Sequence, residues 1–245
     1  MRICWHICEG LLKGGEALPT LAVFGAHAMD AEVMGGAIAR DLSLKNWDTW
    51  LIHMTRGERG KGPHKSIEYA KQLEAEMENS AAKLKSKCIW MGYKAGEIPE
   101  GEAGIMDIGN VLKKVKPDVV ITHWKGSYHP RHVQTHESVI NGLKYMADNF
   151  KMEASLYFGE NLEDLEGFHP TAYYDISESY SAWVEALNCY EMFRESVKFP
   201  YRDFYSSNSI SRGVESGFKY SKALMLPRVK IADLRQDWSL CAPRY

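Results

Sequence analysis

A chain of 245 residues, 45% of them hydrophobic and 25% charged, can bury the core of one large α/β domain. Its formal net charge of −2 argues against nucleic-acid binding, which needs a basic field. No apolar run reaches the length of a membrane span, and the first residues lack the apolar stretch and cleavage site of a secretory signal. Five cysteines without a Cys-x-x-Cys pair fit a reducing compartment, so we expect a cytoplasmic protein.

Short apolar runs alternate with segments of helical periodicity from Leu21 to Asn149. The expected strands are 21–25, 49–54, 88–91 and 118–122, and the expected helices are 31–44, 67–85, 105–115 and 132–149. This alternation is typical of a mostly parallel sheet covered by helices on both faces. Because crossovers between parallel strands are right-handed, a Rossmann-like doubly wound order is favoured.

The C-terminal part is less regular. Strands are expected at 154–158 and 171–176 and a helix at 178–194, and no Pro- or Ser-rich linker precedes them. The sequence therefore predicts a single domain over 1–245, with an N-terminal extension (1–18), an α/β core (19–153) and a C-terminal elaboration (154–245). Cys4, His6 and Cys8 in the extension lack a partner cluster that would complete a tetrahedral metal site, so we expect the extension to pack on the domain or at a subunit contact.

Two clusters of metal-ligand residues follow expected strands. His27 and Asp30 come directly after the first strand, and His129 and His132 come after the fourth. If the strand order is 3-2-1-4, both loops lie side by side at the carboxyl ends of the strands, where ligands bind in open α/β sheets. Two imidazoles and a carboxylate with an open position match a catalytic zinc site, which would polarise a carbonyl and acidify bound water.

The remaining histidines are expected to have structural or supporting roles. Strand-end and loop histidines are more often hydrogen-bonded structural residues than ligands, and we expect this of His53, His64, His123 and His169. His136 lies one helical turn after His132, where it would support a ligand or lie at the surface. A nucleotide-binding function is the weaker interpretation, since no G-x-G-x-x-G follows the first strand.

Several segments resemble the PIG-L/LmbE family of N-acetylglucosaminyl deacetylases. The family's AHPDDAExxxGG is similar to AHAMDAEVMGG here, and its HPDH is similar to HPRH. TRGERGKG, MGYKAGEIP, VKPDVVITH, DISESYSAWVEAL and SRGVESGFKYSKAL also resemble family segments, in the family's order. The resemblance spans residues 21–224 and implies the Rossmann-like fold of that family.

The resemblance also implies roles for particular residues. His27, Asp30 and His132 would bind Zn²⁺ or another divalent metal, and His129 would lie beside the oxyanion or the leaving amine. The substrate would be a small N-acylated amino sugar or glycoside, and the protein would form a homo-oligomer. Arg59 and Trp124, together with Lys61, are the expected substrate contacts because their loops belong to the same face.

Two departures from the family motifs affect the chemistry. The position of the usual general base, an aspartate, holds Met29, and a thioether does not accept a proton near neutral pH. The aspartate inside HPDH is Arg131, whose permanent charge disfavours an imidazolium at His129. The proline of the first motif is also absent, since Ala28 occupies its position. Because general-base catalysis contributes about 10²–10⁴-fold, catalysis is expected to be weakened or altered.

Three acids are candidates to replace the missing base: Glu32, Glu58 and Glu160. The sequence thus predicts a zinc-dependent, deacetylase-like amidohydrolase. The alternative is a metal-retaining, catalytically degenerate protein that serves in binding or regulation.

Overall fold

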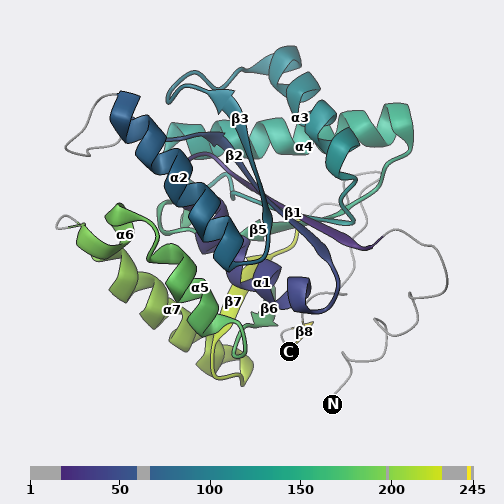
Figure 1. The fold of residues 1–245 in the computed structure, drawn as a ribbon. Coiled ribbons are helices and arrows are strands. Elements are labelled where there is room, and N and C mark those ends of the chain that lie inside the picture. Colours follow the sequence, from purple (N-terminus) through teal and green to yellow (C-terminus); the bar gives the residue numbers. More distant parts are fainter. Residues whose placement is uncertain (1–17, 60–66, 197–198, 228–241, 244–245) are drawn as a thin grey trace.

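The computed structural model describes residues 18–59, 67–196, 199–227 and 242–243 (Figure 1). The N-terminal extension up to residue 17, Lys61 and His64 lie outside the described residues, so the predictions made for them stay predictions. Among the described residues, no helix is both long and apolar enough to cross a membrane.

One sheet runs through the molecule, in the order β3-β2-β1-β4-β5-β7-β6-β8. Its parallel strands are β1 (Thr20–Gly25), β2 (Asp48–Thr55), β3 (Lys87–Tyr93), β4 (Val119–Thr122) and β5 (Ser155–Gly159). The antiparallel strands are β6 (Ala172–Asp175), β7 (Ser221–Met225) and β8 (Ala242–Pro243). The predicted order 3-2-1-4 is confirmed, and it makes β1 and β4 neighbours.

Helices cover both faces of this sheet (Figure 1). On one face lie α3 (Gly101–Val115) and α4 (Pro130–Phe150). On the other lie α1 (Ala37–Leu44), α2 (Ile67–Lys83), α5 (Tyr180–Leu187), α6 (Glu191–Glu195) and α7 (Tyr201–Ser216). Leu21 and Val23 of β1 contribute to the core on the α1 side, and Ala22 and Phe24 to the core on the α4 side. A strand buried on both faces explains why β1 is an unbroken apolar run.

The C-terminal elaboration differs from its prediction in detail. The expected helix 178–194 is divided into α5 and α6, because the chain turns at Tyr190, whose buried ring reaches back into the core. The sequence pattern does not indicate α7 or β7. The strand β7 inserts between β5 and β6, so it converts the parallel sheet into an antiparallel extension.

Candidate metal centre

The loop after β1 folds back on itself and places two polar side chains together. The His27 amide donates to Oδ2 of Asp30 over 2.8 Å, and Met29 between them has a φ of +79°. A Cβ at Gly25 would lie 2.7 Å from the Ala31 nitrogen, so only glycine fits where the chain turns. The chain then enters the π-helix η2 (Glu32–Gly36) before α1, where a regular α-helix was expected.

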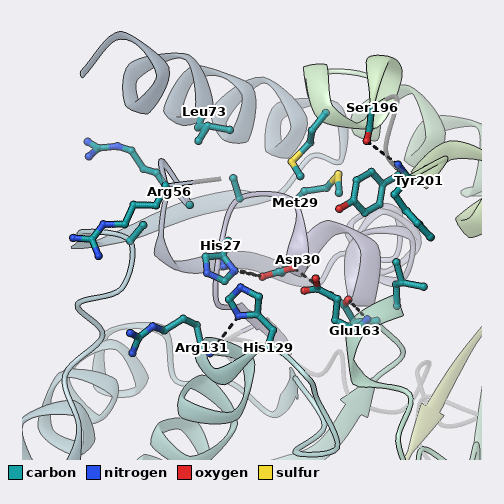
Figure 2. Close-up of a pocket in the computed structure, with 18 of the residues that line it drawn as sticks. His27, Met29, Asp30, Arg56, Leu73, His129, Arg131, Glu163, Ser196 and Tyr201 are labelled. Atoms are coloured by element: carbon teal, nitrogen blue, oxygen red, sulfur yellow. Dashed lines mark hydrogen bonds and ion pairs between the residues drawn. The ribbon is translucent and has the colours of Figure 1, made fainter. Parts of the chain in front are cut away.

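The loop after β4 supplies the second pair of side chains. His129 caps α4: its Nδ1 accepts a hydrogen bond from the Arg131 amide, and Pro130 begins the helix. The His129 ring stacks on that of His132 in the first helical turn and meets the His27 ring edge-on, with centroids 4.7 Å apart in both pairs. Neighbouring strands thus bring the two predicted clusters together at one end of the sheet (Figure 2).

The donor atoms fit a divalent metal. Oδ2 of Asp30 lies 3.3 Å from Nδ1 of His27 and 3.5 Å from Nε2 of His132. Tetrahedral bonds of about 2.0–2.1 Å to zinc require ligand atoms roughly 3.4 Å apart, which matches both distances. The ligand nitrogens of His27, His129 and His132 also lie within 4.8 Å of one another. Asp30, His123 and His132 form a second such group, so the predicted set of His27, Asp30 and His132 takes its members from both groups, which share His132.

A buried carboxylate behind the site orients two of its imidazoles. Asp164, in the 3₁₀ turn η3 (Leu162–Asp164), binds Nδ1 of His132 over 2.7 Å and Nδ1 of His123 over 2.6 Å. Burial opposes its ionisation, but the two histidines outweigh burial and hold the pKa of Asp164 at about 2. The ionised carboxylate accepts the Nδ1 hydrogen of His132 and leaves the Nε2 lone pair free to face the site.

His123 has a different role, although its Nε2 also lies 3.5 Å from Oδ2 of Asp30. Its Nε2 accepts a hydrogen bond from the Ala26 amide over 3.0 Å, so the lone pair that a metal would need is already used. His123 therefore joins the end of β1 to Asp164 as a hydrogen-bonded structural residue, as expected. His53 does the same for the first loop, with Nδ1 donating to the His27 carbonyl over 3.0 Å.

Other expectations about histidine need correction. His169 is exposed, not held by a hydrogen-bonded ring. His136 is buried, so it does not lie at the surface; its Nδ1 bonds to the His123 carbonyl, and its ring packs against Phe158. It supports the loop that carries the site. The two corrections share a cause: the spacing of residues in a helix or loop does not show which side chains the packed sheet buries and which it leaves exposed.

A cavity of about 780 Å³ opens over the metal centre. Its walls come from the loops after β1, β2 and β3, from α2, the start of α4, the η3 turn and the segments around α6 and α7. Of the described residues, three arginines line it, namely Arg56, Arg59 and Arg131, and so do Met192, Phe199, Tyr201 and Tyr205. This is a concave, partly apolar space of the size that takes a small molecule.

The predicted substrate contacts divide between cavity and surface. Arg59 lines the cavity, as expected. Trp124 does not: its ring lies against Phe158 and His136, and its Nε1 donates to the Glu166 carbonyl over 2.9 Å. Trp124 therefore stiffens the loop after β4, and the structure gives no support for the predicted contact with substrate.

None of the three candidate acids lines the cavity. Glu32, the first residue of η2, is fully buried and accepts a hydrogen bond from the Tyr190 hydroxyl. Glu58 accepts from the Ala95 amide, which ties the loop after β2 to the loop after β3. Glu160 is paired with Arg212 of α7. Each carboxylate is held elsewhere in the fold, although Oε2 of Glu32 and Oε2 of Glu58 have no hydrogen-bond partner among the described residues, so the expectation that one of the three serves the site is not supported.

The acid that does reach the site is Glu163, which sequence reasoning missed. Its Oε2 lies 3.5 Å from Nε2 of His132, its side chain is 46% exposed, and burial of the rest raises its pKa. Asn161 donates to Oδ1 of Asp30 over 3.2 Å from the same loop. The signal was available, because N-L-E-D follows β5 at the same edge of the sheet as the two motifs.

His129 is neutral, but the cause differs from the expected one. Burial, followed by its neighbours His132 and His27, lowers the pKa of His129 to about 4. The Arg131 side chain points instead to Gln134, to which it donates a hydrogen bond. Since Nδ1 of His129 accepts the Arg131 amide, its hydrogen is on Nε2.

The fold and the site together define a doubly wound α/β protein with a His/Asp group at the carboxyl ends of its parallel strands that could hold a metal ion. Residues 22–143 match the PIG-L family model, GlcNAc-PI de-N-acetylase. The chain belongs to the PIG-L family through this segment, which holds both motifs, and the predicted resemblance is confirmed. No curated protein matches the chain by sequence.

Solved structures share the fold at low sequence identity. GalB, the 4-carboxy-2-hydroxymuconate hydratase from Pseudomonas putida KT2440, is 16% identical, with 87% of this chain and 98% of that chain covered and a TM-score of 0.76. N,N′-diacetylchitobiose deacetylase from Pyrococcus horikoshii is 19% identical, with 89% of each chain covered and a TM-score of 0.74. A conserved protein from Thermus thermophilus is 19% identical, with 86% of this chain and 95% of that chain covered and a TM-score of 0.72.

Proposed function

We propose that this protein is a metal-dependent hydrolase that removes the acyl group from a small N-acylated amino sugar or glycoside. The convergence of His27, Asp30 and His132 beneath an open cavity carries the proposal. Membership of the PIG-L family supports the reaction class, and the deacetylase from Pyrococcus horikoshii, whose substrate is N,N′-diacetylchitobiose, shares the fold. Zn²⁺ is the metal we expect, because imidazole and carboxylate donors at tetrahedral spacing suit it.

Amide hydrolysis divides into tasks that the side chains can share. A bound metal would polarise the substrate carbonyl and lower the pKa of a water molecule. The neutral His129 presents its Nε2 hydrogen to the cavity, so it can donate to the oxygen that gains negative charge. Because its pKa is about 4, His129 is neutral near pH 7, and its one ring hydrogen is the Nε2 hydrogen that makes this bond.

The attacking water must lose a proton, and the leaving amine must gain one when its bond to the acyl carbon breaks; we propose that Glu163 takes the first proton and delivers it to the amine. Met29 lines the cavity at the usual position of the base but offers only a thioether. Among the described residues that line the cavity, Glu163 is the carboxylate, apart from the ligand Asp30, that contacts the predicted ligands. It enters from η3, which follows β5, and in Figure 2 it lies beside Asp30, on the side away from His27.

A second candidate is a binding or regulatory protein that retains the metal without turnover. Met29 favours it, because the base of the family motif is absent. We also propose that the protein acts in the cytoplasm as a homo-oligomer. Among the described residues Cys88 and Cys189 are free thiols, which fits a reducing compartment.

The deciding experiment measures acetate release and bound metal together. Protein loaded with one equivalent of Zn²⁺ is incubated with N-acetylglucosamine, its methyl glycoside and N,N′-diacetylchitobiose. We expect acetate release that a chelator abolishes and zinc restores. Glu163→Gln should lower kcat by about 10²–10⁴-fold with zinc content unchanged. The matched control is Glu166→Gln, an exposed acid in the same loop. Stoichiometric zinc without acetate from any substrate would favour the binding protein.

A further inference from the structure

Two arginine side chains from distant segments meet over one glycine in the cavity. A Cβ at Gly96 would lie 2.7 Å from Nη1 of Arg59 and 3.8 Å from Nη2 of Arg131. Gly96, in the loop after β3, has a φ of +89°, a left-handed conformation that favours glycine, and its lack of a Cβ leaves room for the Arg59 guanidinium beside it. The loops after β2 and β3 and the start of α4 therefore build one point at which two guanidinium groups converge.

The positive charge at this point is poorly compensated. Arg131 donates to the neutral amide of Gln134 and makes no ion pair with a carboxylate in the described part of the chain. Arg59 faces Glu97 at 3.6 Å, but both side chains are more than half exposed, and such pairs are weak. The third cavity arginine is different, because Arg56 is bound to Glu74 at 2.7 Å and covers the Trp90 ring.

The convergent pair belongs to the same cavity as the metal centre. Arg131 follows His129 by two residues, and both line the cavity with Arg59 and Gly96. Figure 2 shows Arg131 on the side of His129 away from Glu163, so the acidic side chain and the arginine flank the histidines from opposite sides. A molecule whose reacting amide lies over the histidines can extend toward the arginines.

We propose that Arg59 and Arg131 bind an anionic group of the substrate, a carboxylate or a phosphate. Guanidinium groups remain charged at any working pH and pair with both anions through two parallel hydrogen bonds. Two guanidinium groups that approach each other without a carboxylate between them are stabilised when an anion enters. Arg131 stands where the family motif has an aspartate, so the charge at this point is reversed relative to that motif. This inference rests on the proposed function and narrows its substrate to acidic amino sugars.

The test compares neutral and anionic ligands on the zinc-loaded protein. N-acetylglucosamine is the neutral ligand, N-acetylmuramic acid carries a carboxylate, and the 1- and 6-phosphates of N-acetylglucosamine carry a phosphate. Binding is measured by calorimetry and turnover by acetate release. We expect one of the anionic ligands to bind at least about 10-fold more tightly than the neutral sugar, because hydrogen bonds to charged groups are the strong ones. Which ligand does so separates carboxylate from phosphate.

Variants then assign the preference to the arginines. Arg131→Gln and Arg59→Gln should each reduce the ratio of anionic to neutral affinity about 10-fold or more, and Arg131→Lys should retain part of it. Arg202→Gln is the matched control, because Arg202 lies on α7 outside the cavity and its removal changes net charge equally. Circular dichroism confirms that each variant is folded.

The outcomes separate this inference from the function on which it rests. Anion-selective binding that depends on the two arginines, without acetate release, would support the anion site and refute the hydrolase. Acetate release with equal affinity for neutral and anionic sugars would refute the anion site and leave the hydrolase standing. The inference is also overturned if Arg131→Gln and Arg59→Gln keep the selectivity of Arg202→Gln.

Discussion

Replacement of Asp164 by asparagine tests the arrangement behind the metal centre. The carboxylate accepts hydrogen bonds from Nδ1 of both His123 and His132, but an amide oxygen can accept from one of them, while the amide nitrogen would face the hydrogen of the other. The second imidazole must then move its hydrogen to Nε2. For His123 that hydrogen would collide with the Ala26 amide, and for His132 it would occupy the lone pair that faces the metal.

The magnitude follows from the pKa. Burial raises the pKa of Asp164 and the two histidines outweigh it, so the value falls from an ordinary 3.8 to about 2; at about 1.4 kcal/mol per unit, the ionised carboxylate is stabilised by a net of roughly 2–3 kcal/mol. Because the folded pKa lies below the unfolded one, this stabilisation is complete above about pH 4 and is lost as pH falls toward 2. Asp164→Asn should therefore lower the free energy of unfolding of the metal-free protein at pH 7 by about that amount.

The assay is urea unfolding of chelator-treated protein, followed by competitive zinc titration. Loss of an orienting carboxylate typically weakens metal binding by about 10–100-fold. Asp148→Asn is the control, since Asp148 is exposed on α4 and its substitution changes the charge equally. If Asp164→Asn matches Asp148→Asn in both unfolding and zinc affinity, the inferred role of the carboxylate is wrong.

Three further predictions concern the cavity and the core. Met29→Asp should fold normally, since aspartate tolerates the φ of +79° better than methionine. It should raise kcat less than about 10-fold, because the loop after β5 already supplies a carboxylate. A gain in kcat of two decades or more would show that the natural chain lacks its base. His129, with a pKa of about 4, is neutral from pH 5 upward, so kcat/KM should not fall near pH 6.5 as the pH is lowered. A fall near pH 6.5 that disappears in His129→Gln would contradict this. Gly142→Ala should destabilise the protein by about 1–3 kcal/mol in urea unfolding, because its Cβ would lie 2.9 Å from Cβ of Ile108. Gly109→Ala, whose Cβ would have its nearest contact at 3.3 Å, should cost less, and an equal loss would refute the packing argument.

Local sequence patterns were enough to predict the part of the site that comes from the loops after β1 and β4. His27 and Asp30 lie three residues apart after an apolar strand, and His129 and His132 have the same spacing after another. The alternation of strands and helices then gave the neighbouring positions of β1 and β4, which place the two loops together. Such predictions succeed because each depends on periodicity, on the handedness of crossovers and on short spacings, all of which are written in the chain.

The sequence did not predict which acidic side chains reach the site. Glu32 is two residues from Asp30, yet the π-turn of η2 directs it into the core toward Tyr190. Glu163 and Asp164 are far from both motifs in sequence but reach the site because β5 pairs with β4. Proximity in sequence to a motif is therefore a poor guide to which acid serves it, since the direction of a side chain follows from packing.

The sequence by itself determined the doubly wound core and the family, and it predicted the metal-ligand triad and the absence of the usual base at Met29. The tertiary structure decided which carboxylate faces the cavity, which histidine keeps a free lone pair, and that Arg59 and Arg131 converge over Gly96. The physical reason is the range of the interactions. Strands, helices and short motifs are set by neighbours along the chain, whereas a cavity wall is assembled from loops that only the packed sheet brings together.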